Sequence, residues 1–189
     1  MTGGSRGLTP VWDALVRVLH WSLVLTVAAA WLTRHSPGRW HEWLGYATLA
    51  VVAVRVAWGF LGSGHARFAD FVRSFPATAR YARDVVAHRE ARYLGHNPLG
   101  GWMVIALLSM VAAVGISGWL YTTDRYWGVP WVEALHSTLS DVLFAFVALH
   151  ILGVVFTSAR HRENLVAAML HGRKPADRPD PGPERARRR

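Results

Sequence analysis

Two histidines in one apolar stretch are the residues of this chain best placed to do chemistry. His136 and His150 lie 14 positions apart in residues 135–157, LHSTLSDVLFAFVALHILGVVFT. In a helix this separation is a rise of about 21 Å and a rotation that leaves the two side chains only about 40° apart. Both imidazoles therefore face one side of the helix at two depths. Because ionisable side chains are costly inside a bilayer, such residues usually face a bundle interior and serve a function.

The composition indicates a membrane protein whose main metal-binding residue is histidine. Of the 189 residues, 52% are hydrophobic and ten are Trp. This is too apolar for an ordinary soluble domain of the same length, so we expect one membrane-embedded domain. The chain contains no cysteine. That excludes disulfides, thiolate zinc sites, iron–sulfur clusters and thioether-linked haem.

Four apolar runs are long enough to cross a hydrocarbon core of about 30 Å. They cover about residues 14–33, 43–62, 99–121 and 135–157. We therefore predict an all-α, polytopic membrane protein, a four-transmembrane-helix bundle over residues 1–172 with an interfacial loop at 63–98. The first run also fits a signal peptide, with Arg6 and Arg17 as its basic flank and residues 28–30 as a cleavage site. Three further spans favour a membrane helix.

The distribution of positive charge predicts the orientation. Of the 21 Lys and Arg residues, 17 lie on the side of the termini and residues 62–98, three lie on the other side (Arg34, Arg39 and Arg125), and Arg55 lies within a span. Since positive loops stay in the cytoplasm, we expect both termini and the 62–98 loop to be cytoplasmic. The net charge of +9 thus reflects topology and contact with anionic lipid, and it predicts no nucleic-acid partner.

The loop and the tail have different predicted roles. Phe68, Phe71 and Phe75 are helically spaced among charges in ARFADFVRSF, and TARYARDVVAHREARYL after Pro76 has a similar pattern. Both segments are expected to be short helices on the inner membrane surface, contacting lipid in preference to a partner protein. Residues 173–189 are Pro-rich and charged, so they are predicted to be a disordered basic tail.

Topology assigns four histidines to two layers. His20 and His150 fall at the inner level, and His41 and His136 fall at the outer level. A facing pair of histidines without a cysteine or carboxylate fits the two axial positions of a b-type haem, so we predict two haem b groups. Each histidine taken alone could instead be a hydrogen-bonded core residue. Asp141, the only acid in a predicted span, could orient a ligand, carry protons or hydrogen-bond within the bundle.

Other residues fit a haem at these levels. Arg55 lies 14 positions after His41, at the inner level, where it could pair with a propionate or extend toward the cytoplasm. Gly45 and Gly153 lie on the ligand-bearing faces and would let a flat macrocycle approach the backbone. Small residues also serve helix packing in membranes, which is the role expected of Gly115 and Gly118.

Several motifs together resemble the bacterial cytochrome b561 family, which includes the b-type cytochrome subunits of nickel–iron hydrogenases. They are VWDALVRVLHW, the His41-Glu42-x-x-Gly45-Tyr46 stretch, RVAWGFLGSGHARFADF, LGHNPLGGWM and HILGVVFTSARHRENLVAAMLHGRK. The resemblance runs from about Pro10 to Lys174. It implies a four-helix, two-haem, quinone-linked cytochrome of the bacterial inner membrane, with one haem held by the first and fourth helices and the other by the second and fourth. Those pairs are His20 with His150 and His41 with His136.

The resemblance implies electron transfer between a periplasmic donor, such as a redox protein or dehydrogenase subunit, and the membrane quinone pool. Asn97, His96 and Arg17 are candidate hydrogen-bonding residues for quinone near the inner haem. The donor, the direction of flow and assembly into a homodimer stay open.

Two other classes of function are considered. The first is a stand-alone superoxide:quinone oxidoreductase, in which Arg34, Arg39 and Arg125 would steer the anion to the outer haem. The resemblance therefore leaves open whether the chain is itself an enzyme. The second is a haem-free transporter that uses the same histidines for zinc or nickel, which the scarcity of intramembrane carboxylates disfavours.

Overall fold

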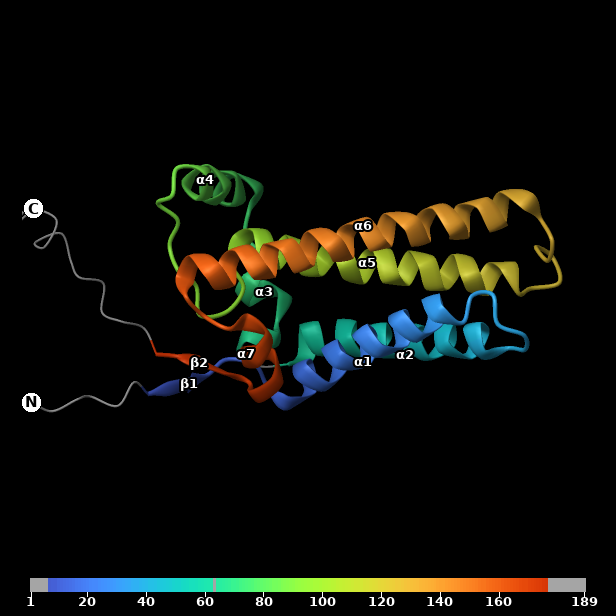
Figure 1. Cartoon of the computed structure of the whole chain (residues 1–189), viewed down its shortest axis with the longest axis horizontal. Helices are drawn as coiled ribbons and strands as arrows, with labels where there is room; N and C mark the ends of the chain where they lie inside the picture. Colours follow the sequence, from blue (N-terminus) through green and yellow to red (C-terminus); the bar gives the residue numbers. More distant parts are fainter. Residues whose placement is uncertain (1–6, 63, 177–189) are drawn as a thin grey trace, which may run out of the picture.

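The computed structural model describes residues 7–62 and 64–176. Its four long helices are α1 (Ala14–Leu32), α2 (Trp40–Leu61), α5 (Pro98–Tyr121) and α6 (Pro130–His161). Each is long and apolar enough to cross a membrane. They lie side by side in an elongated bundle (Figure 1). The prediction of a mostly helical protein with four helices long and apolar enough to span a membrane is confirmed, and the fourth helix extends beyond its predicted span at both ends.

Local sequence signals explain where the long helices begin. The Asp13 carboxylate accepts a hydrogen bond from Val16 N (2.7 Å) at the start of α1, and the Asn97 side chain accepts one from Gly100 N (2.7 Å) at the start of α5. Both side chains satisfy an N–H group that has no partner within the helix. Pro98 and Pro130 begin α5 and α6, where a missing N–H costs nothing.

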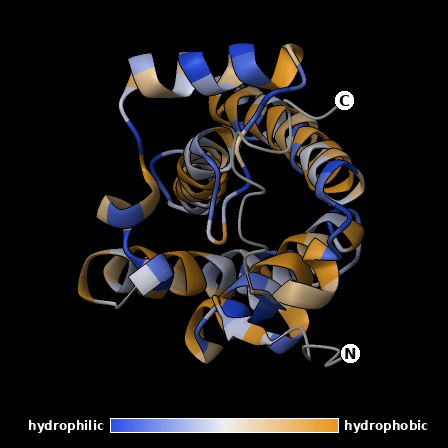
Figure 2. Cartoon of the chain, turned by 90° about the vertical axis from the view of Figure 1, so that its left-hand side faces the viewer, coloured by the Kyte–Doolittle hydropathy of each residue, from blue (hydrophilic) through white to orange (hydrophobic). Residues whose placement is uncertain are grey.

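The bundle core lies between α2, α5 and α6. Val52, Val111 and Leu143 are buried together, and the packing order of the helices is α1–α2–α5–α6. A Cβ at Gly115 would lie 2.6 Å from Leu49, so Gly115 allows α2 and α5 to approach closely, as predicted. Many apolar side chains on the long helices are exposed, as expected for surfaces in contact with lipid. Figure 2, which looks down the bundle from one end, shows that hydrophobic residues make up much of the long helices.

The shorter elements gather at one end of the bundle, and they include the strands at the start and the end of the described chain (Figure 1). We call this the terminal end, and the end formed by residues 33–39 and 122–129 the loop end. The shorter elements are β1 (Leu8–Pro10), the 3-10 turn η1 (Gly64–Ala66), α3 (Phe68–Phe71), α4 (Phe75–Val86), α7 (Leu165–His171) and β2 (Arg173–Pro175).

The loop helices differ in extent from their prediction. The second one, α4, begins at Phe75 and includes Pro76 in its first turn, because Pro fits there without losing a hydrogen bond. It ends at Val86, and residues 87–97 are irregular. His88 has φ 56°, a left-handed conformation that a continuing helix cannot contain.

The tail predicted from residue 173 is ordered over its first residues, which corrects that boundary. β2 pairs antiparallel with β1, with Thr9 opposite Lys174. Lys174 is 5% exposed, and its Nζ lies 3.8 Å from Oε2 of Glu163. These contacts order residues that are too polar and too short to form a strand alone. The rest of the predicted tail, residues 177–189, lies outside the described residues.

Candidate functional site

His41 and His136 face each other near the loop end. Their ring centroids are 6.0 Å apart and their planes are 83° apart. Nδ1 of His41 lies 2.8 Å from the Ala30 carbonyl oxygen, and Nδ1 of His136 lies 3.0 Å from that of Val114. A carbonyl only accepts hydrogen bonds, so each Nδ1 carries the proton and donates it. Each Nε2 is left with its lone pair, the form in which histidine binds a metal.

His20 and His150 form the second pair, toward the terminal end. Their ring centroids are 6.5 Å apart, with planes 55° apart. The indole of Trp21 packs edge-on to His20 at 5.2 Å. Nδ1 of His20 is buried and has no hydrogen-bond partner within the described part of the chain. The two pairs lie about 21 Å apart along α6, by the helix rise between His136 and His150.

The spacing within each pair fits one metal ion between two rings. A histidine nitrogen binds a transition metal at about 2.0 Å and lies about 1.1 Å from its ring centre, so two trans imidazoles have centroids about 6.2 Å apart. The observed 6.0 and 6.5 Å lie on either side of this value. Each pair could therefore provide both axial ligands of one metal centre.

The donor set fits a metal within a macrocycle better than a bare ion. Over residues 7–62 and 64–176, no group of three or more His, Asp or Glu side chains could hold a metal. A Cβ added at Gly45 or Gly153 would meet no atom within 4 Å. Both histidine pairs also join helices that are not neighbours in the packing order, α6 with α1 and α6 with α2. A planar group with four equatorial nitrogens of its own suits such pairs.

Arg55 lies at the terminal end of α2 with its side chain turned inward. It is 6% exposed, its Nη2 donates to the Ala66 carbonyl oxygen (3.4 Å), and its guanidinium lies 5.4 Å from the Phe68 ring centre. Its Nη1 is buried without a hydrogen-bond partner among the residues that the structure places. A buried cation with an unused donor fits an anionic ligand, such as a propionate.

The candidate quinone residues have different surroundings. Asn97 uses its side-chain oxygen to cap α5. Arg17 donates from Nη1 to the Leu170 carbonyl oxygen (2.6 Å), while its Nε is buried without a partner in the described chain. Nδ1 of His96 is likewise buried and unpaired there, and its ring packs 4.6 Å from the rings of both Trp12 and Phe71. Burial, followed by the nearby cations Arg55 and Lys174, lowers the pKa of His96 to about 3.

Unpaired buried polar atoms concentrate around the terminal-end histidine pair. The described residues contain five such side-chain atoms, and four of them are nitrogens of Arg17, His20, Arg55 and His96. Buried polar groups without a partner are rare in folded proteins. This concentration indicates that the terminal end of the bundle is built to contact polar ligand atoms.

Three contacts around His136 could not be predicted from the sequence. The Val114 carbonyl and Ser117 Oγ, which lies 3.1 Å from Nδ1, orient the ring. A Cβ at Gly118 would lie 2.9 Å from Cε1 of His136, so this glycine makes room for the imidazole and does more than pack helices. The three positions follow one another at helical spacing in α5, but no signal in the sequence pairs them with α6.

Asp141 is exposed, and it lies about 160° around α6 from the buried Leu143. The expected roles inside the bundle therefore do not fit its position.

These observations define a class of protein: a helical membrane protein whose bundle holds two pairs of facing histidines at two depths. The family model described as prokaryotic cytochrome b561 matches residues 11–172, so the chain belongs to that family. Membership makes it a b-type cytochrome of transmembrane electron transfer and implies that it binds haem b. No curated protein matches the chain.

Proposed function

We propose that this chain is a di-haem cytochrome that transfers electrons across the bacterial inner membrane, between a periplasmic donor and the quinone pool. The observation that carries the proposal is the pair of imidazole distances, 6.0 Å and 6.5 Å, at two levels of one bundle. We place the termini and the terminal end of the bundle in the cytoplasm and the loop end in the periplasm, because the distribution of Lys and Arg predicts this orientation.

The chain would hold one haem b with His41 and His136 and the other with His20 and His150. When bound, haem b supplies reversible one-electron Fe(III)/Fe(II) chemistry. The two histidines at each level would hold the haem iron from both sides, and this would disfavour oxygen binding and favour outer-sphere transfer. The Ala30 and Val114 carbonyls hold the loop-end rings in the ligating tautomer. Arg55 provides a buried positive charge for a propionate.

Quinone would bind beside the terminal-end pair, where Arg17 and His96 each have a buried, unpaired nitrogen. A quinone carbonyl is an acceptor for such a donor. Asn97 lies next to His96. The helix cap uses its oxygen and not its NH₂ group, and the side chain also interacts with Tyr81.

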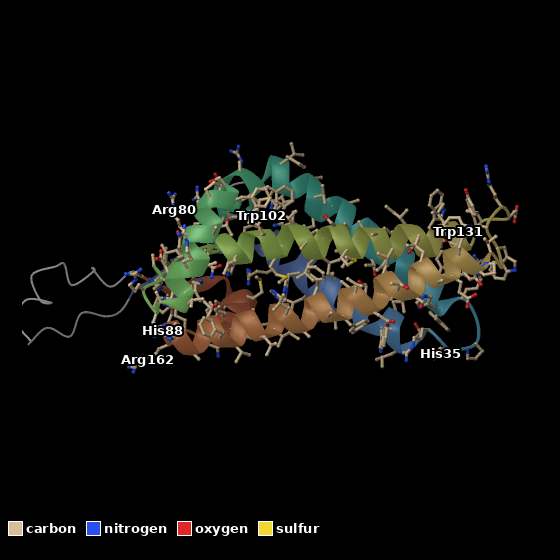
Figure 3. The ribbon with its side chains drawn as sticks, turned by 90° about the horizontal axis from the view of Figure 1, so that it is seen from above. His35, Arg80, His88, Trp102, Trp131 and Arg162 are labelled. Atoms are coloured by element: carbon tan, nitrogen blue, oxygen red, sulfur yellow. The ribbon has the colours of Figure 1, made fainter. Side chains whose placement is uncertain are left out.

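The first test is the haem content of purified protein, measured as haem per chain and by reduced minus oxidised spectra. We expect two low-spin haems in the wild type and one in each of His20→Ala, His41→Ala, His136→Ala and His150→Ala. The control is His88→Ala, which changes an exposed histidine outside the four long helices (Figure 3). This variant should keep both haems. A ligand variant that retains two haems with unchanged spectra would contradict the assignment.

An alternative function is a stand-alone superoxide:quinone oxidoreductase. It is favoured by Arg34 and Arg125, which lie exposed at the loop end and form no ion pair within the described chain. Arg39 is a weaker candidate because its Nε already contacts Glu42 at 2.8 Å. This alternative would be supported if superoxide rapidly reduced the haem without a partner protein. The reduction should be slower in Arg34→Gln and with added salt.

A further inference from the structure

Helix α4 lies across the bundle at its terminal end, outside the four long helices. It is seen nearly end-on in Figure 1 and lengthwise in Figure 2. It sits beside the ends of α5 and α6 and not beyond them (Figure 1). If the long helices cross the membrane, the axis of α4 runs parallel to the membrane plane at the level of the membrane surface.

Three faces of α4 have different chemistry. Phe75, Ala79, Ala82 and Val86 fall within about 60° around the helix, and Phe75 and Val86 are 72% and 82% exposed. Tyr81 is buried on another face and packs 5.5 Å from Tyr93.

The third face of α4 is cationic. Arg80 and Arg83 lie about 140° and 80° from Phe75 around the helix. Both are exposed, as is Arg73 just before the helix. The side chain of Arg80 points away from the bundle (Figure 3). The acids near this face are Asp84, half-buried on α4, and Asp70, exposed on α3. Glu90 also lies near Tyr81, but its buried carboxylate is paired with Arg160.

Contacts with α5 fix the depth of the apolar edge. The Phe75 ring stacks on the Trp102 ring at 4.6 Å with 18° between their planes, and the Trp102 indole donates to the Arg73 carbonyl oxygen (3.0 Å). Trp102 lies four residues into α5, about 6 Å from the helix start. Tryptophan at this depth of a membrane helix marks the boundary between headgroups and hydrocarbon. Phe75 is thus held where acyl chains begin.

We propose that α4 docks on an anionic phospholipid leaflet. The edge formed by Phe75, Ala79 and Val86 enters the acyl region, while Arg73, Arg80 and Arg83 contact headgroup phosphates. An exposed apolar edge flanked by arginines is the pattern of helices that lie in a membrane interface. Charge complementarity favours anionic over neutral lipid, since each basic residue near such a surface adds to the attraction. This inference does not rest on haem or quinone binding.

The test uses the absence of cysteine, which makes each introduced thiol a unique labelling site. Ala79→Cys on the apolar edge and Asp84→Cys on the opposite side are each spin-labelled in the full chain. The proteins are reconstituted in vesicles of phosphatidylcholine alone or with phosphatidylglycerol. Collision rates with oxygen and with a water-soluble nickel chelate then report burial in lipid. Position 79 is expected to have less nickel access and more oxygen access in anionic than in neutral vesicles, while position 84 keeps its nickel access in both.

Matched arginine variants separate lipid recognition from general electrostatics. Arg80→Gln and Arg162→Gln remove one positive charge each, from exposed positions at the same end of the bundle (Figure 3). We expect Arg80→Gln to restore nickel access at position 79 and Arg162→Gln to leave it unchanged. Free nickel access at position 79 in every vesicle would overturn the proposal. Equal burial in neutral and anionic vesicles, insensitive to Arg80→Gln, would overturn the recognition of anionic lipid.

Discussion

The imidazole of His136 has two polar contacts that orient it, more than any other proposed ligand has. Its Nδ1 lies 3.0 Å from the Val114 carbonyl oxygen and 3.1 Å from Ser117 Oγ, and Gly118 leaves space beside the ring. Groups that orient a ligating histidine can change metal affinity about 10–100-fold. Residues that never touch the haem should therefore control how well the loop-end pair binds it.

Gly118→Ala tests this control directly. The added Cβ would lie 2.9 Å from Cε1 of His136, so the ring must shift from the position in which Nδ1 contacts the Val114 carbonyl oxygen. We expect about 10–100-fold weaker haem binding at the loop-end pair and a shift in its midpoint potential. Alanine favours helix formation over glycine, so weaker binding could not be attributed to a weakened α5. Haem titration and redox titration measure the effect. Ile116→Ala, at an exposed position of α5, is the control, and equal behaviour of the two variants would contradict the prediction.

His96 should make stability depend on pH. Its pKa is lowered to about 3 by burial, whereas an unfolded histidine titrates near about 6.5. Between these values only the unfolded chain binds the proton, so this contribution to stability is complete above about pH 6.5 and lost as pH falls toward 3, by about 1.4 kcal/mol per pH unit. His96→Gln should flatten this dependence in detergent unfolding measured from pH 7.5 to 5. His88→Gln, at an exposed position, should not, and parallel curves for wild type and His96→Gln would refute the assignment.

At the scale of elements, Asn97 shows how one side chain can combine two roles. Its oxygen caps α5 at 2.7 Å from Gly100 N, so Asn97→Leu would remove the cap along with any contact to quinone. A loss of quinone-linked activity in that variant would be ambiguous.

Asn97→Ser separates the two roles, because serine caps helices about as well as asparagine but has no amide NH₂. We expect Asn97→Ala to lower the free energy of unfolding by about 1 kcal/mol and Asn97→Ser to change it little. Thermal unfolding in detergent measures both. If the stable Asn97→Ser protein reoxidises with quinone at the wild-type rate, the amide has no role there.

The long helices could be predicted from sequence because their signal is local. An apolar run of about 20 residues is visible without knowing its neighbours. The separation of 14 residues between His136 and His150 indicates that they share a face of the helix. The ends were harder to predict. α6 begins at Pro130 and ends at His161, in segments where polar residues interrupt the run and hydropathy no longer marks the helix.

At the scale of the whole molecule, the missed features are contacts between distant segments. β1 and β2 are three residues each and contain Pro, so neither has a strand pattern. They are ordered because they meet each other: Val11 N and Trp12 N both donate to the Gly172 carbonyl oxygen. Glu163 likewise forms ion pairs with Arg92 and Lys174, which belong to two other segments. Such pairings follow from the packed bundle and have no local sequence signal.

The Glu163 carboxylate should be a main stabiliser of the terminal end. Its side chain is 8% exposed, and it contacts Arg92 through one oxygen and Lys174, 6% exposed, through the other. Burial lowers the pKa of Lys174, and the Glu163 carboxylate opposes that shift. Glu163→Gln leaves a buried cation without its anion, a change that typically costs about 3–5 kcal/mol.

The double variant Glu163→Gln with Lys174→Met removes the buried cation as well, and we expect it to recover most of the lost stability. A double-mutant cycle on the unfolding free energy, measured in detergent, gives the coupling between the two side chains. Glu42→Gln breaks the more exposed pair with Arg39, whose side chain is 67% exposed, and should cost far less than Glu163→Gln because solvent screens the pair. Additive effects at positions 163 and 174 would show that the two side chains stabilise the terminal end independently.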